Sequence, residues 1–293
     1  MIITTSEQLR NLTGSFYANN DFSKIENTVK GVESEICRIL GMDTLDELQD
    51  EVLLAAQQAV AFMATMRFNK LNDISHENAG RKVKIDKENE ARPFEWQLAR
   101  DDRAHLEEYY RALDRLVFCL MGDDGFQQSP LYQRIQKVII RDADELTWLT
   151  GVEPSPWLYV QLLPFLLESQ QFVTKAYGEG FDPNNMMPLP DTDTLDYAAK
   201  MAVALGAIVL MGRRTSLQAL PYGLMQLATS NGGGNIENAP SMQQLDAYLK
   251  QLSSDQRYWI NEMKVLRDRI AGSEPVSHLQ MPENNRKNKY MRI

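Results

Sequence analysis

The sequence predicts an all-α protein of two similar helical bundles, with a small β-hairpin arm and an extended C-terminal arm. Along most of the 293 residues, apolar side chains recur three or four positions apart, which is the period of an amphipathic helix. Ala-rich segments occur in both halves, and small residues let helices approach one another closely. Strand-like alternation is confined to short segments. These three observations favour helices packed on helices.

The first half, residues 1–125, is predicted to form one bundle. Ser6 is the expected N-cap of a short helix that ends at Leu12. Gly41 is expected to end the second helix in a left-handed conformation. The four expected helices span residues 6–12, 25–40, 50–71 and 95–121. Val83–Asp86 alternates apolar and polar residues, which is typical of a strand, so residues 78–94 are predicted to form an exposed hairpin arm.

The second half, residues 126–272, is predicted to form the other bundle. Leu131–Thr150 contains a β-branched run and is compatible with helix and with strand. Helices are expected over residues 157–177, 194–214, 218–229 and 241–270. Ser230–Pro240 contains three consecutive glycines and is expected to be flexible. Residues 273–293 are expected to form a polar C-terminal arm.

Composition and charge exclude several classes of function. The chain carries 31 Lys and Arg against 40 Asp and Glu, a net charge of −9, which argues against a surface that binds nucleic acid phosphates throughout. Cys37 and Cys119 lie in apolar helical segments and are expected to be reduced thiols in the cytosol or a similar compartment. The three histidines are far apart, so no zinc-site spacing occurs.

No targeting segment or membrane span is expected. The first residues have neither the basic region nor the long apolar region of a signal peptide. The longest apolar run, Met201–Gly212, would be about 18 Å long as a helix, whereas a bilayer core is about 30 Å thick. A fully buried helix is the better interpretation of this run.

Three landmarks recur in the same order in the two halves. Ala55–Ala61 and Ala198–Ala204 share five of their seven residues. Before each of these segments lies a helix that ends in glycine, Gly41 in the first half and Gly178 in the second. After each lies a long helix with paired aromatic residues and a closing glycine. These are Tyr109-Tyr110 to Gly122 and Tyr258-Trp259 to Gly272. We interpret this order as an internal duplication, with chance similarity of Ala-rich helices as the alternative.

One repeat resembles the head–tail connector (adaptor) proteins of tailed phages. Those proteins begin with a short helix, continue with a helix of regularly spaced Ile that ends at Gly, and then have a central Ala- and Val-rich helix. The corresponding segments here are Ser6–Leu12, Ile25–Gly41 and Ala55–Asn69. In the second repeat, Met211–Arg214 followed by Leu220–Gly223 is similar to the closing pattern.

The whole chain also resembles a two-repeat family found in tailed phages and prophages of Bacteroides-type bacteria. The similar segments are Lys84–Glu88, Pro93–Gln97, Tyr110–Leu116 and Leu131–Ile135. Connectors typically carry one helical unit, whereas this chain would carry two. The resemblance implies a structural virion protein that forms a ring of about twelve copies, docks on the portal protein and extends the DNA channel.

Residues with catalytic potential are few. Three carboxylate groups could bind a hard cation or share a proton: Asp101-Asp102, Asp142/Asp144/Glu145 and Asp191/Asp193/Asp196. Solvated helix faces and helix N-terminal acids are the simpler interpretation, because acids there favour the helix dipole. No phosphate loop, nucleophile elbow or di-iron motif occurs. We therefore expect neither an enzyme nor a cofactor or metal.

Two arms are the predicted partner-binding segments. The hairpin arm presents Arg81, Lys82, Lys84 and Lys87, and a strand-like arm can add an edge to a neighbouring subunit, although an unanchored surface loop fits equally well. The C-terminal arm is basic with apolar anchors: Arg286, Lys287, Lys289, Tyr290, Met291 and Arg292. A disordered tail, an arm that docks on a partner protein and an arm near packaged DNA are its three possible roles.

The expected function is therefore mechanical. The chain would lie in the virion neck, after assembly in the host cytoplasm, in contact with further copies, the portal and tail or neck proteins. DNA would pass through its channel without sequence-specific binding, and no membrane would be involved. A tail-completion ring is one alternative, and a cytosolic helical enzyme or ligand-binding protein with a pocket between the bundles is another.

Overall fold

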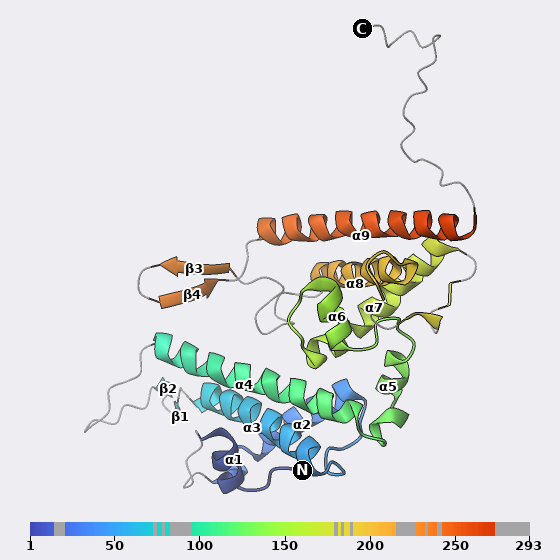
Figure 1. Cartoon of the computed structure of the whole chain (residues 1–293). Helices are drawn as coiled ribbons and strands as arrows, with labels where there is room; N and C mark the ends of the chain where they lie inside the picture. Colours follow the sequence, from blue (N-terminus) through green and yellow to red (C-terminus); the bar gives the residue numbers. More distant parts are fainter. Residues whose placement is uncertain are drawn as a thin grey trace, which may run out of the picture.

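The computed structural model describes residues 1–14, 21–72, 75–77, 80–82, 95–178, 181–182, 185–187, 190–214, 227–231, 234–238 and 242–272. Most of this part of the chain is helical, so the predicted all-α class is confirmed. The helices form two groups, α1–α4 and α6–α9, with α5 between them (Figure 1). Buried apolar residues of both groups form one continuous core.

The first group is centred on α3. Its elements are α1 (Ser6–Thr13), η1 (Phe22–Lys24), α2 (Glu26–Leu40), α3 (Asp50–Asn72) and α4 (Glu95–Met121). Helix α3 packs against α1, α2 and α4. Its alanines Ala55, Ala56, Ala59 and Ala61 are fully buried, because a face of small residues lets three helices approach the same segment.

The ends of these helices follow from local sequence, with one correction. Gly41 ends α2 with φ 69°, the left-handed conformation expected there. The N-cap of α1 is Thr5 instead of Ser6. Thr5 accepts a hydrogen bond from the backbone of Gln8, whose side chain bonds back to the backbone of Thr5. Threonine followed three residues later by glutamine is a capping box, and this reciprocal pair places the N-cap one residue before Ser6, which is the first residue of the helix.

The connection between the groups settles a segment that the sequence left open. Between α4 and the second group lie η2 (Phe126–Gln128), α5 (Pro130–Ile135) and α6 (Ala143–Thr150). Leu131–Thr150 is therefore helical at both ends and irregular in the middle. Val138, Ile139 and Ile140 in that middle part are buried, so their β-branched side chains fill the core without forming a strand.

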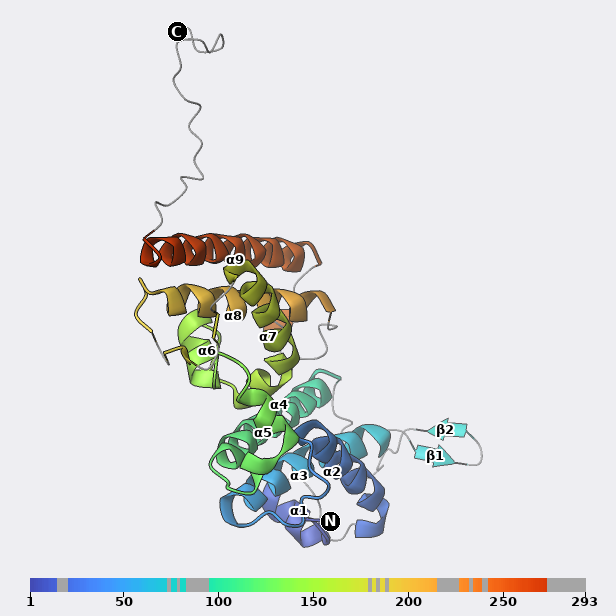
Figure 2. The ribbon, with the colours of Figure 1, turned by 90° about the vertical axis from the view of Figure 1, so that its right-hand side faces the viewer.

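The second group is centred on α8. Its main helices are α7 (Pro156–Tyr177), α8 (Leu195–Arg214) and α9 (Met242–Ile270). Helix α8 packs against α6, α7 and α9, and α9 forms the side of the molecule opposite α1 (Figure 2). Among the described helices, α8 alone has the length and hydropathy of a membrane span, yet most of its span-like window is buried inside the protein. The predicted buried helix is thus confirmed.

Two short antiparallel strand pairs complete the described chain. Strands β1 (Ser75–Glu77) and β2 (Gly80–Lys82) pair with each other, as do β3 (Leu227–Asn231) and β4 (Gly234–Asn238). The helix expected over residues 218–229 is wrong at its end, where β3 begins. Two glycines separate β3 from β4, and a two-residue Gly-Gly spacing favours a hairpin, so part of the segment expected to be flexible is paired. The strand expected at residues 83–86 lies outside the described residues.

Candidate functional site

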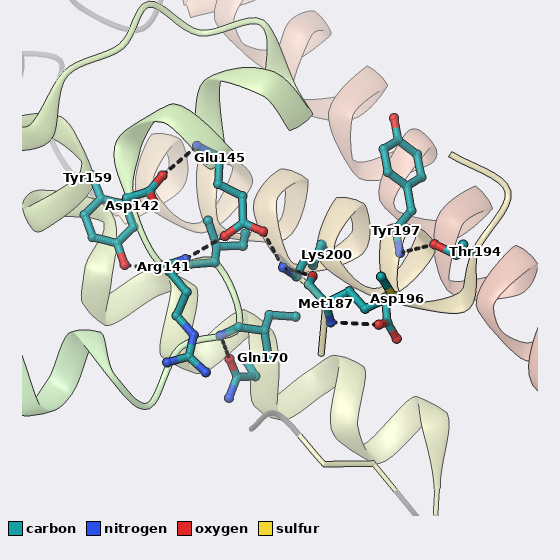
Figure 3. A network of polar contacts seen from close by, with 12 residues as sticks. Arg141, Asp142, Glu145, Tyr159, Gln170, Met187, Thr194, Asp196, Tyr197 and Lys200 are labelled. Carbon is teal, nitrogen blue, oxygen red and sulfur yellow. Dashed lines mark hydrogen bonds and ion pairs between the residues drawn. The ribbon is translucent and has the colours of Figure 1, made fainter. Parts of the chain in front are cut away.

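A buried ion pair lies at the centre of the second group (Figure 3). Lys200 of α8 is 1% exposed and Glu145 of α6 is 3% exposed. The ammonium nitrogen of Lys200 donates to Glu145 Oε1 and, at 2.6 Å, to the carbonyl oxygen of Met187. Two buried charges of opposite sign offset each other's loss of hydration, so these residues depend on each other.

Glu145 corrects the expectation that its carboxylate group is a solvated helix terminus. Its Oε2 accepts the backbone N–H of Arg141 at 2.7 Å. Asp142 does act as the N-cap of α6, because its Oδ1 accepts the backbone N–H of Glu145 at 2.7 Å. Asp142 therefore caps the helix, whereas Glu145 reaches into the core. The signal that could have revealed this pair is a lysine inside an Ala-rich buried segment, because such a lysine needs an acidic partner.

Other polar side chains hold the irregular segment that precedes α6. Gln170 accepts the backbone N–H of Ile139 and donates to the carbonyl of Lys137, both at 2.9 Å. The hydroxyl of Tyr159 donates to the carbonyl of Ile140 at 2.8 Å, and burial raises the pKa of this phenol. The backbone groups of a buried loop need such partners, so these side chains explain how Val138, Ile139 and Ile140 remain in the core.

Asp196 and Thr194, near the start of α8, also bind backbone groups. Asp196 accepts the backbone N–H of Met187 at 2.9 Å, and Thr194 accepts that of Tyr197 at 3.2 Å. No cluster of His, Cys, Asp and Glu that could hold a metal ion occurs among the described residues. The hydrogen bonds of Asp196 and Thr194 therefore position the α7–α8 connection against α8.

The first group contains a similar contact in its own Ala-rich segment. Gln57 aligns with Lys200 in the matched Ala-rich segments, and its amide donates to the carbonyl of Ile2 at 2.8 Å. The backbone N–H of Ile2 donates to Glu33 at 2.8 Å, and burial raises the pKa of that carboxyl. In both groups the third residue of the Ala-rich segment thus binds a backbone carbonyl outside its own helix.

Asp114 joins the two groups. Its Oδ1 accepts the hydroxyl of Ser155 at 2.6 Å and the backbone N–H of Trp157 at 2.9 Å. Ser155 is the N-cap of α7, so a carboxylate of α4 binds the N-terminus of a helix in the other group. Partial burial raises the pKa of Asp114, against the opposing effect of the two hydrogen bonds.

A row of aromatic rings crosses the outside of the second group. Trp148 of α6 contacts Tyr197 of α8, which contacts Trp259 of α9, which contacts Tyr258. The ring centroids are 5.2 to 5.4 Å apart, in edge-to-face geometry. Both end members are exposed, Trp148 at 46% and Tyr258 at 56%. Exposed aromatic rings of this kind are characteristic of protein contact surfaces.

A groove of about 1100 Å³ opens on the first group, beside the end of α4. We call it the acidic groove, because the described residues that line it include four carboxylates and no Lys or Arg. Its residues come from the α2–α3 connection, the start of α3, the end of α4 and the following turn: Met42, Glu47, Leu48, Gln49, Asp50, Glu51, Val52, Phe118, Cys119, Met121, Gly122, Asp123, Gly125, Phe126 and Ser129.

The two predicted arms lie outside what the structure describes, apart from one short part. The backbone of Arg81 and Lys82 belongs to β2, and their side chains are outside the described part, as are Lys84 and Lys87. The same is true of the whole C-terminal arm, including Arg286, Lys287, Lys289, Tyr290, Met291 and Arg292. Their roles in partner binding therefore stay predictions.

Several other titratable side chains are buried or paired. His105 is buried, and its Nδ1 lies 3.0 Å from the carbonyl oxygen of Asp101. Asp102 pairs with Lys70 at 3.4 Å. Cys37 is buried and Cys119 is partly exposed; both are free thiols, and burial raises the pKa of each.

Comparison of the chain with models of protein families, with curated proteins and with solved structures gives no match.

Proposed function

We propose that this chain is a structural protein of a phage neck, a head–tail connector that assembles into a ring. The ring, of about twelve copies by resemblance, docks on the portal and extends the DNA channel toward the tail. The protein is assembled in the host cytoplasm and remains in the virion neck. Its action is mechanical: many weak contacts repeated around a closed ring hold it in place without a single strong site.

The observation that carries this proposal is the pairing of two helical units in one chain, each with exposed apolar surface. The acidic groove lies on the first unit and the aromatic row on the second. Glu145, Tyr159 and Lys200, which are buried in the second unit, bind backbone atoms or one another. Surfaces available for contact, on units whose buried polar side chains of this kind serve the fold, suit a protein that assembles.

We further propose that the two units arose by duplication. In both, an Ala-rich helix is the central one and follows a helix that ends at a glycine with positive φ, 69° at Gly41 and 91° at Gly178. The corresponding contacts of Gln57 and Lys200 with backbone carbonyls support the same origin. The hairpin arm, residues 78–94, and the C-terminal arm, residues 273–293, would then be additions to the units that reach neighbouring subunits.

Assembly with the portal tests the proposal. The purified chain is mixed with portal rings and examined by light scattering and electron microscopy, beside a variant that lacks residues 280–293. The full chain should form a ring on the portal, and the shortened chain should lose assembly while its thermal unfolding is unchanged. A monomer that ignores the portal and binds a small molecule would contradict the proposal and favour the ligand-binding alternative.

A further inference from the structure

The acidic groove combines an apolar floor with a negative rim. Leu48 and Phe126 are buried in its floor, and Val52 and Met121 are partly exposed. Phe118 stands in the groove at 69% exposure. Its rim carries four exposed carboxylates: Glu47, Asp50, Glu51 and Asp123. An exposed phenyl ring among like charges is an unpartnered surface, and the partner it fits is basic and apolar at once.

One segment of this chain has that composition. Residues 284–293 carry four basic residues, no acid, and the apolar side chains of Tyr290, Met291 and Ile293. The hairpin arm fits less well, because Asp86, Glu88 and Glu90 alternate with its basic residues. Charge complementarity therefore singles out the C-terminal segment among the chain's predicted arms.

The C-terminal segment is also long enough to leave its own molecule. Twenty-one residues follow Gly272, and an extended chain of that length reaches about 70 Å. Helix α9, from which it continues, lies on the opposite side of the molecule from the first group, where the groove opens (Figure 1).

We propose that the acidic groove binds residues 284–293 of a neighbouring copy of this chain. This inference rests on the proposed ring, and it names the contact that would join adjacent subunits. Each copy would carry one groove and one segment, so the contact is head-to-tail and can be repeated until a ring closes. Carboxylates of the rim face the basic side chains, while Phe118 and Met121 receive the apolar ones.

Cys119 provides a direct test, because it lines the groove and is partly exposed, whereas Cys37 is buried. One chain carries Met291→Cys and Cys119→Ser. The other lacks residues 280–293 and keeps Cys119. After the two are mixed and oxidised with diamide, we expect a disulfide between position 291 of one chain and Cys119 of the other, identified by peptide mass.

Two results would overturn this inference. One is a yield of disulfide-linked dimer no higher than with Cys119→Ser in both chains, where only Cys37 remains as a partner for position 291. The other is a disulfide within single molecules when Met291→Cys is placed in an otherwise unchanged chain, since the segment would then bind its own groove. If the full chain still forms rings on the portal in either case, the proposed function stands and only the assigned contact is wrong.

Charge exchange supplies an independent test. Glu47→Lys with Glu51→Lys should weaken self-association about tenfold in light scattering at low salt, as expected for the loss of partly screened charge pairs. Adding Lys287→Glu and Lys289→Glu to the same chain should restore it. Glu7→Lys with Glu153→Lys is the matched control, because both residues are exposed acids outside the groove and Glu7, like Glu51, lies in a first helical turn. Equal weakening in the control, or no restoration, would count against the groove.

Discussion

Lys200 illustrates how one residue can organise a segment far from it in sequence. The other buried residues of its helix are all non-polar, yet its ammonium group binds Glu145 of α6 and the carbonyl of Met187. These contacts attach the α7–α8 connection and the start of α6 to the central helix. A lysine at this depth is tolerated only because both partners are present.

Replacing Lys200 should therefore be costly. Lys200→Met leaves the Glu145 carboxylate buried without a counter-charge, and the free energy of unfolding should fall by about 3–5 kcal/mol. Adding Glu145→Gln removes that unpaired charge and keeps an oxygen for the backbone N–H of Arg141, so the double variant should be more stable than Lys200→Met alone. Urea unfolding of the parent, Lys200→Met and the double variant measures both effects. A Lys200→Met protein as stable as the parent would refute the argument.

Glu35 and Arg67 form the clearest pH-dependent pair. Arg67 donates to both carboxylate oxygens of Glu35, at 2.7 and 2.8 Å, and joins α3 to α2. This bonding lowers the pKa of Glu35. The folded protein then binds fewer protons than the unfolded chain, so the stabilisation is complete above the unfolded pKa and is lost as the pH falls through the folded pKa.

Glu35→Gln should expose that dependence. The two side chains are 42% and 38% exposed, so solvent screening limits the loss at pH 7 to about 0.5–1 kcal/mol. The difference from the parent should shrink as the pH falls below the ordinary glutamate pKa, because the parent loses the charge as well. Chemical denaturation at pH 7 and pH 3 measures it, and Glu26→Gln, which affects only an exposed pair with Lys30, is the control.

At the scale of helices, the close packing of α7 and α9 on α8 limits the size of the side chain that fits at position 206. A Cβ on Gly206 would lie within 3.0 Å of the side chains of Ser169 in α7 and Gln256 in α9. Gly31 in α2 is different, because a Cβ there would meet nothing within 4 Å. The two glycines therefore differ in role. Gly206 allows α7 and α9 to approach α8 closely, whereas Gly31 makes no close contact and only weakens its helix.

The same substitution should consequently have opposite effects at these two sites. Gly206→Ala should destabilise the protein by about 1–3 kcal/mol, because overpacking outweighs the better helix propensity of alanine. Gly31→Ala should stabilise it by up to about 1 kcal/mol. Melting temperatures of the two variants test this comparison, which fails if both substitutions shift the melting temperature in the same direction.

The sequence predicts elements well where the pattern is long and local. The helix Glu95–Met121 follows from its apolar periodicity, and the helix Asp50–Asn72 follows from a long apolar run rich in Ala. The error at Leu227–Asn231 has a different origin, because the apolar run after Pro221 predicts a helix whereas the Gly-Gly spacing that follows favours a hairpin. The burial of Glu145 could not be derived from its neighbours, since its partner Lys200 is 55 residues away.

At the scale of the molecule, the connection between the two groups is narrow. Helices α4 and α7 meet there, and Asp114 binds the N-terminus of α7 through Ser155 and Trp157. The acidic groove lies on one side of this connection and the aromatic row on the other. The relative orientation of these two surfaces therefore depends on a small number of contacts.

Asp114→Ala should loosen that connection. The variant leaves the hydroxyl of Ser155 and the N–H of Trp157 without their acceptor, a loss of about 1–3 kcal/mol. We expect scanning calorimetry to resolve two transitions where the parent shows one, because each group keeps its own central helix. Asp246→Ala, which removes an exposed pair with Lys250 on α9, is the control; a single transition in both variants would show that the groups unfold together without Asp114.

The aromatic row has a practical consequence for measuring the association of this protein by fluorescence. Three of the four tryptophans of the chain lie in α6–α9, namely Trp148, Trp157 and Trp259, so indole emission reports chiefly on that part of the chain. Trp148 is half open to water, and its emission would move to shorter wavelength when a neighbouring protein covers it. A spectrum recorded during association would then reveal whether this face, or the opposite end of the molecule, meets its partner first.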